Sequence, residues 1–322
     1  MLRKKQVVLL LLAALLFSAC AAQRRPTEQQ TPLTGDRVES LLAAYDLSRL
    51  LQRVEVLTSP KLQGRAAGSD AENNAGDYLI EELQHIGLAP WQSNGMDGYR
   101  QSFRVRGKRQ TAENILAYLP GQSRDSLLVV SAHYDHLGIR NGSYYPGADD
   151  NAVGVAVLLE IAECLAQSGI KPERTVLFAL LTAEENGLLG STALANKLRR
   201  DGQADKTVVL NLDMLGGIGG NSLDVWTERS RPDGQLIASI ARQEIEAAGV
   251  TATRLQRRFA VVDSLPFARR GMPSITLSWD LTRANHPYRH TPNDTYANLR
   301  RDLIERGSRA CLRVTLALAN RR

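Results

Sequence analysis

Residue types that bind divalent cations recur along this 322-residue chain. Two histidines and three carboxylates stand out, with Glu184 as a spare acid beside one of them: His133, Asp150, Glu185, Asp213 and His290. Imidazole nitrogens and carboxylate oxygens are ligands of zinc-class cations, and a shared carboxylate can hold two such cations about 3.5 to 4 Å apart. Such a site leaves an open position for water. The residue set therefore predicts a metal-dependent hydrolase.

The segment His133-Tyr134-Asp135 can combine a metal ligand with a side chain that orients it. Alternate residues on an extended segment point the same way, so Asp135 can accept the other N–H of the His133 ring. His136 competes as a ligand, but the same alternation places it on the opposite face. The alternative for His133 is a core histidine whose hydrogen bonds are satisfied.

Two pairs of adjacent acids offer further ligands. Asp149 and Asp150 precede an apolar helical pattern, where aspartate also serves as a turn or capping residue. The alternative is that one of them points into a cleft and bridges two cations. Glu184 and Glu185 follow a buried strand, and neighbouring side chains at such a junction point in different directions. One glutamate can then bind metal while the other acts as a general base on water.

The elements that must position these residues alternate from about residue 113 onward. Short apolar runs (ENILAYL, LLVVSAH, TVLFALLT, TVVLNLD) are separated by helical patterns at 152–167 and 187–200. A strand at 223–227, a helix at 234–248, a strand at 273–279 and a closing helix near 298–319 come next along the chain. This alternation predicts an α/β fold, a three-layer α/β/α sandwich with a mostly parallel mixed central sheet. Upstream, we expect helices around 37–57 and 70–87, with loops and one short strand in 88–111.

The candidate ligands fall where predicted strands end. His133 ends LLVVSA, Glu184 and Glu185 follow LFALLT, Asp213 follows VVLNL, and His290 lies beyond SITLSW. In open α/β sheets, ligands bind outside the carboxyl ends of the strands. Four separate strand ends therefore converge on one edge of the sheet.

The N-terminus has the features of an export signal. Residues 1–19 combine a basic start, an apolar core and a small-residue exit. The ending before Cys20 resembles the bacterial lipobox, which implies lipidation of Cys20, although Phe17 departs from the usual aliphatic residue. The alternative is an ordinary secretory signal cleaved after Ala21. Residues 20–36 are polar and predict a flexible tether to a single catalytic domain over 37–322.

The predicted export signal indicates in which compartment the protein acts. We expect a cell-envelope protein, lipid-anchored at the outer membrane and facing the periplasm of a Gram-negative bacterium. Three of the basic residues behind the net charge of +6 lie in the signal, and the remaining charge is too small to indicate nucleic-acid binding. Cys164 and Cys311 lie in apolar helical patterns, where either a disulfide or two buried thiols is compatible with this compartment.

Five ordered motifs resemble one family. H-Y-D, P-G-A-D-D-N-A-V-G, A-E-E-N-G-L-L-G-S, N-L-D-M-L and H-T-P-N-D-T together look like the M28 zinc aminopeptidases. The resemblance covers roughly residues 55–315, including the stretch LQGRAAGSDAENNAGDYLIEELQHIGLAP that is typical of bacterial members. It implies a fold of the zinc-dependent exopeptidase type, peptide substrates and two zinc ions per chain. No protease-associated insert is apparent.

The resemblance implies a dinuclear site in which Asp150 bridges the two zinc ions. It also implies a role for the other candidates: His133 and Asp213 on one ion, Glu185 and His290 on the other, Glu184 as general base and Asp135 orienting His133. Two departures concern other positions. Arg289 stands where some relatives have a tyrosine that stabilises the oxyanion, with Tyr288 one step earlier. Ser264 stands where many bacterial relatives have a histidine; either His286 compensates or it is a polar loop histidine.

Two other functions remain open. A glutaminyl cyclase shares this architecture but uses one zinc ion, and its resemblance is confined to the scaffold and the stretch at 263–273. A catalytically silent surface lipoprotein would be expected to lose Glu184 or a ligand. Retention of both histidine ligands with G-A-D-D-N favours the two-metal aminopeptidase. Side-chain specificity, the physiological metal and the oligomeric state are not predicted.

Overall fold

The computed structural model describes residues 35–93, 95–105, 110–228, 232–256 and 261–321. The predicted signal peptide, Cys20 and most of the predicted tether lie outside these residues. The first described helix, α2 (Gly35–Ala43), begins at the end of the tether segment. All the other helices and strands belong to the unit formed by Asp36–Arg322.

A mixed sheet forms the centre of this unit, and its strands follow the order β1-β3-β7-β4-β8-β11-β9-β10, with β2 paired to β3. Their bounds are β1 Ala89–Pro90, β2 Arg100–Arg104, β3 Thr111–Leu119, β4 Ser123–His133, β7 Arg174–Leu181, β8 Thr207–Leu212, β9 Ser222–Thr227, β10 Thr251–Gln256 and β11 Ser274–Trp279. The four strands β7, β4, β8 and β11 run parallel to one another. Strands β3 and β9 flank them in antiparallel pairs.

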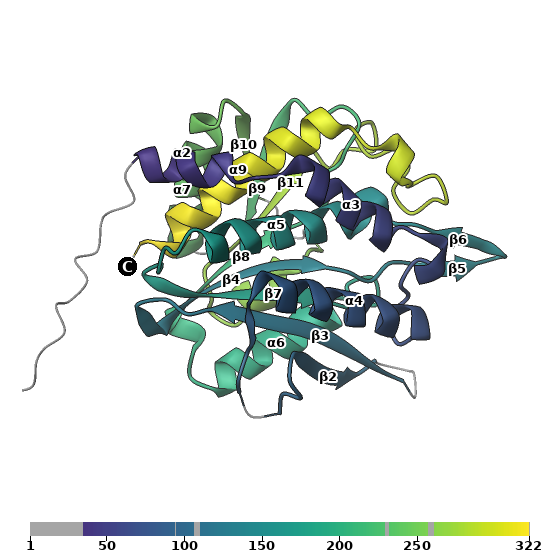
Figure 1. Cartoon of the computed structure of the whole chain (residues 1–322), viewed down its shortest axis with the longest axis horizontal. Coiled ribbons are helices and arrows are strands. Elements are labelled where there is room, and N and C mark those ends of the chain that lie inside the picture. The colour runs from purple at the N-terminus through teal and green to yellow at the C-terminus, as the bar shows by residue number, and fades with distance from the viewer. Residues whose placement is uncertain (1–34, 94, 106–109, 229–231, 257–260, 322) are drawn as a thin grey trace, which may run out of the picture. The chain divides into compact units, whose positions relative to one another are not determined.

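Helices cover both faces of the sheet, which confirms the predicted three layers (Figure 1). On one side α5 packs against three other helices, and on the opposite side α6 packs against α8. Bounds on the first side are α3 Leu47–Leu57, α4 Asp70–Ile86, α5 Val153–Gln167 and α9 Arg301–Ala319, which packs against α7 Pro232–Ala247. On the second side they are α6 Leu189–Arg200 and α8 Ser264–Ala268. Because both faces are covered, every residue of β8 and β11 is buried.

Several element boundaries differ from the sequence-based expectation. The single helical region expected at 37–57 is two helices, because the Asp46 carboxylate caps α3 by accepting the N–H groups of Ser48 and Arg49. Residues 88–111 contain β1 and β2 instead of one strand. We did not expect the edge strand β10 or the hairpin of β5 (Gly138–Arg140) and β6 (Ser143–Tyr145).

Cys164 and Cys311 are both buried free thiols. Of the two alternatives, the structure therefore has two buried thiols and no disulfide between them. Burial raises the pKa of the Cys164 thiol to about 12 and that of Cys311 well above its usual range.

Within the described residues, no helix is both long and apolar enough to cross a membrane.

A buried ionic cluster joins α3 to α5, the helix that follows the predicted metal-binding turn. The Glu160 carboxylate is fully buried and accepts hydrogen bonds from Arg49 Nη2 at 2.6 Å and Arg53 Nη1 at 3.1 Å. It also accepts the backbone N–H of Asp46 at 2.8 Å. Glu163 shares Arg53 through Nη2 at 2.6 Å. A charge buried in this way depends on its partners, because without Glu160 the buried Arg53 Nη1 and the backbone N–H of Asp46 would both lose their acceptor.

We therefore expect Glu160→Ala to lower the free energy of unfolding by about 3–5 kcal/mol, the usual cost of removing one partner of a buried ion pair. Urea unfolding of the purified chain measures this change. Glu55→Ala, on the exposed side of α3, is the control and should change stability by less than about 0.5 kcal/mol. Equal stability of the two variants would contradict a structural role for the cluster.

Candidate metal centre

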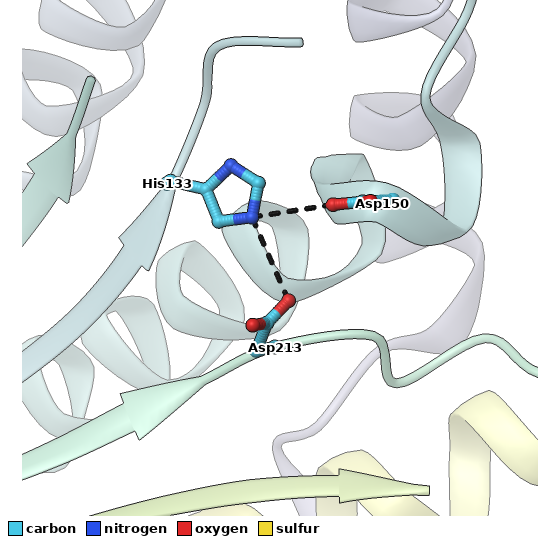
Figure 2. Close-up of side chains that lie close together, drawn as sticks. All are labelled: His133, Asp150 and Asp213. Atoms are coloured by element: carbon cyan, nitrogen blue, oxygen red, sulfur yellow. Dashed lines mark ion pairs between the residues drawn. The ribbon is translucent and has the colours of Figure 1, made fainter. Parts of the chain in front are cut away.

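Three predicted ligands converge at the carboxyl end of the parallel strands. His133 is the last residue of β4, Asp213 directly follows β8, and Asp150 lies in the turn Ala148–Ala152 before α5. Figure 2 shows the two carboxylates pointing at the same ring nitrogen. His133 Nε2 lies 3.3 Å from Asp150 Oδ1 and 3.5 Å from Asp213 Oδ1.

The other two predicted ligands lie close to each other, and His290 faces the second carboxylate oxygen of Asp150. His290 Nε2 lies 3.1 Å from Asp150 Oδ2 and 3.1 Å from Glu185 Oε1. Glu185 follows β7, and His290 lies in the loop after β11. The structure therefore brings all five predicted ligands together, with Asp150 between two groups of donors.

These donors fit metal ions of the zinc class. Ligand atoms bound to zinc in tetrahedral geometry at about 2.0–2.1 Å lie about 3.3 Å from one another, and the separations here are 3.1–3.5 Å. Two of the buried donor oxygens, Glu185 Oε1 and Asp213 Oδ1, accept no hydrogen bond from any described residue. Buried carboxylate oxygens are costly to leave without a partner, and a bound cation would supply one.

The turn that presents Asp150 is held by two side chains. The Asp294 carboxylate accepts the backbone N–H of Asp149 at 2.8 Å and that of Asp150 at 3.1 Å. The Asn151 amide donates to Leu212 O at 2.9 Å and accepts the N–H of Met214 at 3.2 Å. Asn151 thereby bonds the residues on both sides of Asp213. These contacts fix Asp150 and Asp213 relative to each other before any cation binds.

Asp135 links the His133 strand to the two glutamates. Its carboxylate accepts the backbone N–H groups of Glu184 at 3.1 Å and Glu185 at 3.3 Å. His133 Nδ1 faces the backbone oxygen of Asp135 at 3.2 Å and its carboxylate Oδ1 at 3.6 Å. Asp135 therefore lies beside His133 Nδ1, with its backbone oxygen closer than its carboxylate, and it also positions the segment that carries Glu184, which the sequence did not indicate.

His136 is placed differently from the expectation. It was expected on the face opposite His133, but His136 Nδ1 lies 3.0 Å from Glu185 Oε1. The expectation was wrong because β4 ends at His133, and alternation does not hold beyond the end of a strand. His286 also differs from a polar loop histidine: its ring is buried, and Nδ1 contacts the Asp149 carboxylate.

Residues 114–315 match the family model of Peptidase family M28. The chain belongs to peptidase family M28. It is 27% identical over 278 residues to a probable leucine aminopeptidase of Arthroderma otae, an alignment that covers 81% of this chain and 70% of that protein.

Solved structures of several proteins share the fold of this M28 chain. The aminopeptidase LapA of Legionella pneumophila has a TM-score of 0.73 at 19% identity, covering 89% of this chain and 75% of its own. For BSAP, a zinc aminopeptidase from Bacillus subtilis, the TM-score is 0.71 at 17% identity, and the match covers 86% of this chain and 96% of BSAP. A glutaminyl cyclase of Porphyromonas gingivalis has a TM-score of 0.70 at 19% identity, and the match covers 84% of this chain and 98% of the cyclase. The family makes the chain a peptidase and thus a hydrolase.

Arg65 supports the candidate metal centre of this peptidase, although no pattern in the sequence predicted a role for it. The side chain is fully buried, and its guanidinium donates to the backbone oxygens of Tyr134 at 2.6 Å, Pro146 at 2.8 Å and Gly147 at 3.1 Å. It also contacts the backbone oxygen of Leu57. Arg65 therefore joins the segment after His133 to the turn that carries Asp150. Its place within the motif LQGRAAGS was the only available signal.

Charges within the site shift the pKa of its carboxylates in opposite directions. Burial alone would raise the pKa of Glu185, but the neighbouring rings of His136 and His290 lower it to about 2. Burial raises the pKa of Glu184 well above its usual range, against the influence of His133, and the nearby carboxylate of Asp263 adds to the rise. Glu185 is therefore suited to remain an anionic ligand, whereas Glu184 is suited to take up a proton.

A cavity of about 490 Å³ opens beside His290. Apolar and basic side chains line it, among them Met214, Leu281, Arg283 and Arg289. Arg289 reaches the metal centre from this cavity, because its Nε donates to Asp150 Oδ2 at 3.3 Å. The cavity therefore offers room for a substrate group directly beside the candidate ligands.

We expect Asp294→Asn to weaken metal binding by about 10- to 100-fold, the usual effect of losing a partner that holds a ligand in place. The two N–H groups bind different oxygens of the carboxylate, and asparagine replaces one of those oxygens with an NH2 group that cannot accept a hydrogen bond. Titration with zinc against a competing chelator measures the dissociation constant. Asn293→Ala, at an exposed neighbouring position, is the control. Zinc affinity that is the same in both variants would contradict the role of Asp294.

Proposed function

We propose that this peptidase is an aminopeptidase that uses two zinc ions to hydrolyse N-terminal residues from peptides. The observation that carries the proposal is the position of Asp150, whose two oxygens face different groups of donors. His133 and Asp213 would hold one ion with Asp150, and Glu185 and His290 would hold the other. The leucine aminopeptidase and zinc aminopeptidase names among the similar proteins support this reaction and this metal.

Two zinc ions, when bound, would polarise the peptide carbonyl and lower the pKa of a water molecule towards about 7. The protein's own contribution is to place a base beside that water. Glu184 is partly buried at the site, and the Asp135 carboxylate fixes its backbone. Glu184 would take a proton from the water molecule while the water oxygen attacks the carbonyl carbon. The same carboxyl group would then give the proton to the departing amine.

Arg289 is our candidate for stabilising the negative charge that develops on the carbonyl oxygen. Only its Nε is directed to Asp150 in the described contacts, and its side chain is about half exposed to the adjacent cavity. A guanidinium carries five N–H donors, so further donors remain for a substrate oxygen. Arg289 would thereby take the role that a tyrosine has in some relatives.

A glutaminyl cyclase is the nearest alternative, because it shares the fold and would use one zinc ion. One group of donors, such as His133, Asp150 and Asp213, would suffice for that chemistry. The presence of a second group around Glu185 and His290 favours two ions instead. A silent binding protein is the other alternative, and measurable turnover would exclude it.

Assays with two substrates test the proposed function. We expect the purified protein to release p-nitroaniline from Leu-p-nitroanilide, to lose this activity with a chelator and to regain it with zinc. Glu184→Gln should retain zinc but lose at least about 100-fold in kcat, because it removes the general base. Cyclisation of Gln-Phe without hydrolysis of the leucine substrate would overturn the proposal, and so would unchanged turnover by Glu184→Gln.

We also propose that the peptidase is exported and anchored to the cell envelope through a lipid on Cys20. The support is the sequence of residues 1–19, with its basic start, apolar core and small-residue exit, followed by the cysteine. A lipid on Cys20 and the polar segment up to residue 36 would keep the catalytic unit close to a membrane surface. The peptides of that compartment would then be its substrates.

Labelling with a fatty-acid analogue tests the anchor. In a Gram-negative host we expect the full-length chain to incorporate the label and to fractionate with outer membranes. Cys20→Ala should lose the label, because the acceptor thiol is gone. Cys164→Ala, which removes a buried thiol within the catalytic unit, is the control and should keep the label. An unlabelled wild-type chain, or a labelled Cys20→Ala variant, would contradict lipidation at this position.

A further inference from the structure

His136 is a buried histidine to which neither the family resemblance nor the proposed mechanism gives a task. Only about 2% of the residue is exposed, and neither Nδ1 nor Nε2 makes a hydrogen bond to a described residue. A buried imidazole that serves only the core normally satisfies at least one nitrogen, because an unsatisfied buried polar group is costly. Apart from the Glu185 carboxylate, the ring therefore has no polar partner among the described residues.

The surrounding backbone fixes the position of this ring. The His136 N–H donates to Arg65 O at 3.3 Å, and Ala66 pairs with His136 in an isolated parallel bridge. The ring also packs against Gly147, where a Cβ atom would lie only 2.5 Å from the imidazole Cγ. Glycine at position 147 thus leaves the space that the ring occupies. Small rearrangements of His136 away from the metal centre are restricted on two sides.

The atoms nearest to the ring are those of the second group of metal ligands. His136 Nδ1 lies 3.0 Å from Glu185 Oε1, close to the separation of about 3.3 Å expected for two ligands of one tetrahedral zinc ion. Apart from this close approach, neither of the two atoms makes a hydrogen bond to a described residue. His136, Asp150 and Glu185 each offer a donor atom within 4.8 Å of the others.

We propose that His136 is a direct ligand of the second metal ion. This inference rests on the proposed two-metal function and adds a donor to it. The second ion would then have four protein ligands, namely Asp150, Glu185, His136 and His290. The first ion would have three, namely His133, Asp150 and Asp213.

The unequal numbers of ligands give the two ions different tasks. Zinc sites with four protein ligands are typically closed, whereas three protein ligands leave a position for water. The first ion, beside His133, is therefore the one that has an open position. The second ion is held more firmly, and its main contribution is to fix Asp150 and to provide positive charge. Removal of His136 should therefore affect the affinity of the second ion and spare that of the first.

Zinc-binding measurements on four forms of the mature chain test the proposal. Wild type, His136→Gln, His290→Gln and His85→Gln are loaded with zinc, dialysed and analysed for bound zinc by mass spectrometry, and chelator competition gives the affinity of each site. His290→Gln is the reference for a lost ligand, and His85→Gln changes an exposed histidine of α4. Circular dichroism reports whether each variant is folded.

We expect wild type and His85→Gln to bind two zinc ions. His136→Gln should keep the first ion and bind the second more than about 100-fold more weakly, a larger loss than the roughly 10- to 100-fold expected for a residue that only supports a ligand. A loss within or below that range would overturn the proposal. If wild type itself binds fewer than two ions, the two-metal function fails, which is a distinguishable result.

A second measurement covers the case in which His136→Gln does not fold. X-ray absorption at the zinc edge of the fully loaded wild type reports how many imidazoles surround the two ions. The proposal predicts three, from His133, His136 and His290. Two imidazoles would overturn it, whatever the behaviour of the variant.

Discussion

The accumulation of negative charge at one edge of the sheet is the constraint to which the other features of the structure respond. Asp135, Asp150, Glu184, Glu185 and Asp213 lie within one buried or partly buried region. Carboxylates in such a region repel one another and are costly to remove from water unless positive charge is near. Three histidine rings surround them, and the separations of the donors suit metal ions. The residues at this edge therefore suit the binding of cations.

The fold meets this constraint with rigid elements. The parallel strands β7, β4 and β8 deliver their carboxyl ends to the same edge, so side chains far apart in sequence arrive together. A second set of contacts, made by Asn151, Asp294 and Arg65, joins the strand ends to the turn before α5. Because most of these contacts are to backbone atoms, they fix where the chain runs and leave the ligand side chains free for metal.

Ligands that stand at the ends of apolar strand patterns could be located from the sequence. Apolar runs marked the central strands, and His133, Glu185 and Asp213 stand at or shortly after their ends, so the convergence of these three residues followed from topology. Arg65 and Asp294 were not identified as supports, because their partners are backbone groups, which produce no pairing pattern in a sequence. His136 was misplaced because the alternation rule was extended past the end of β4. The helix break at Asp46 was also missed, since a cap within a continuous apolar pattern is hard to distinguish from helix surface.

Anomalous diffraction can show whether Asp150 lies between two metal ions, which is the basis of the proposed chemistry. Crystals of the zinc-loaded protein would be measured on both sides of the zinc absorption edge. We expect two anomalous peaks about 3.5 to 4 Å apart, one on each side of the Asp150 carboxylate. A single peak at Asp150, or two peaks that do not share this residue, would contradict the dinuclear site.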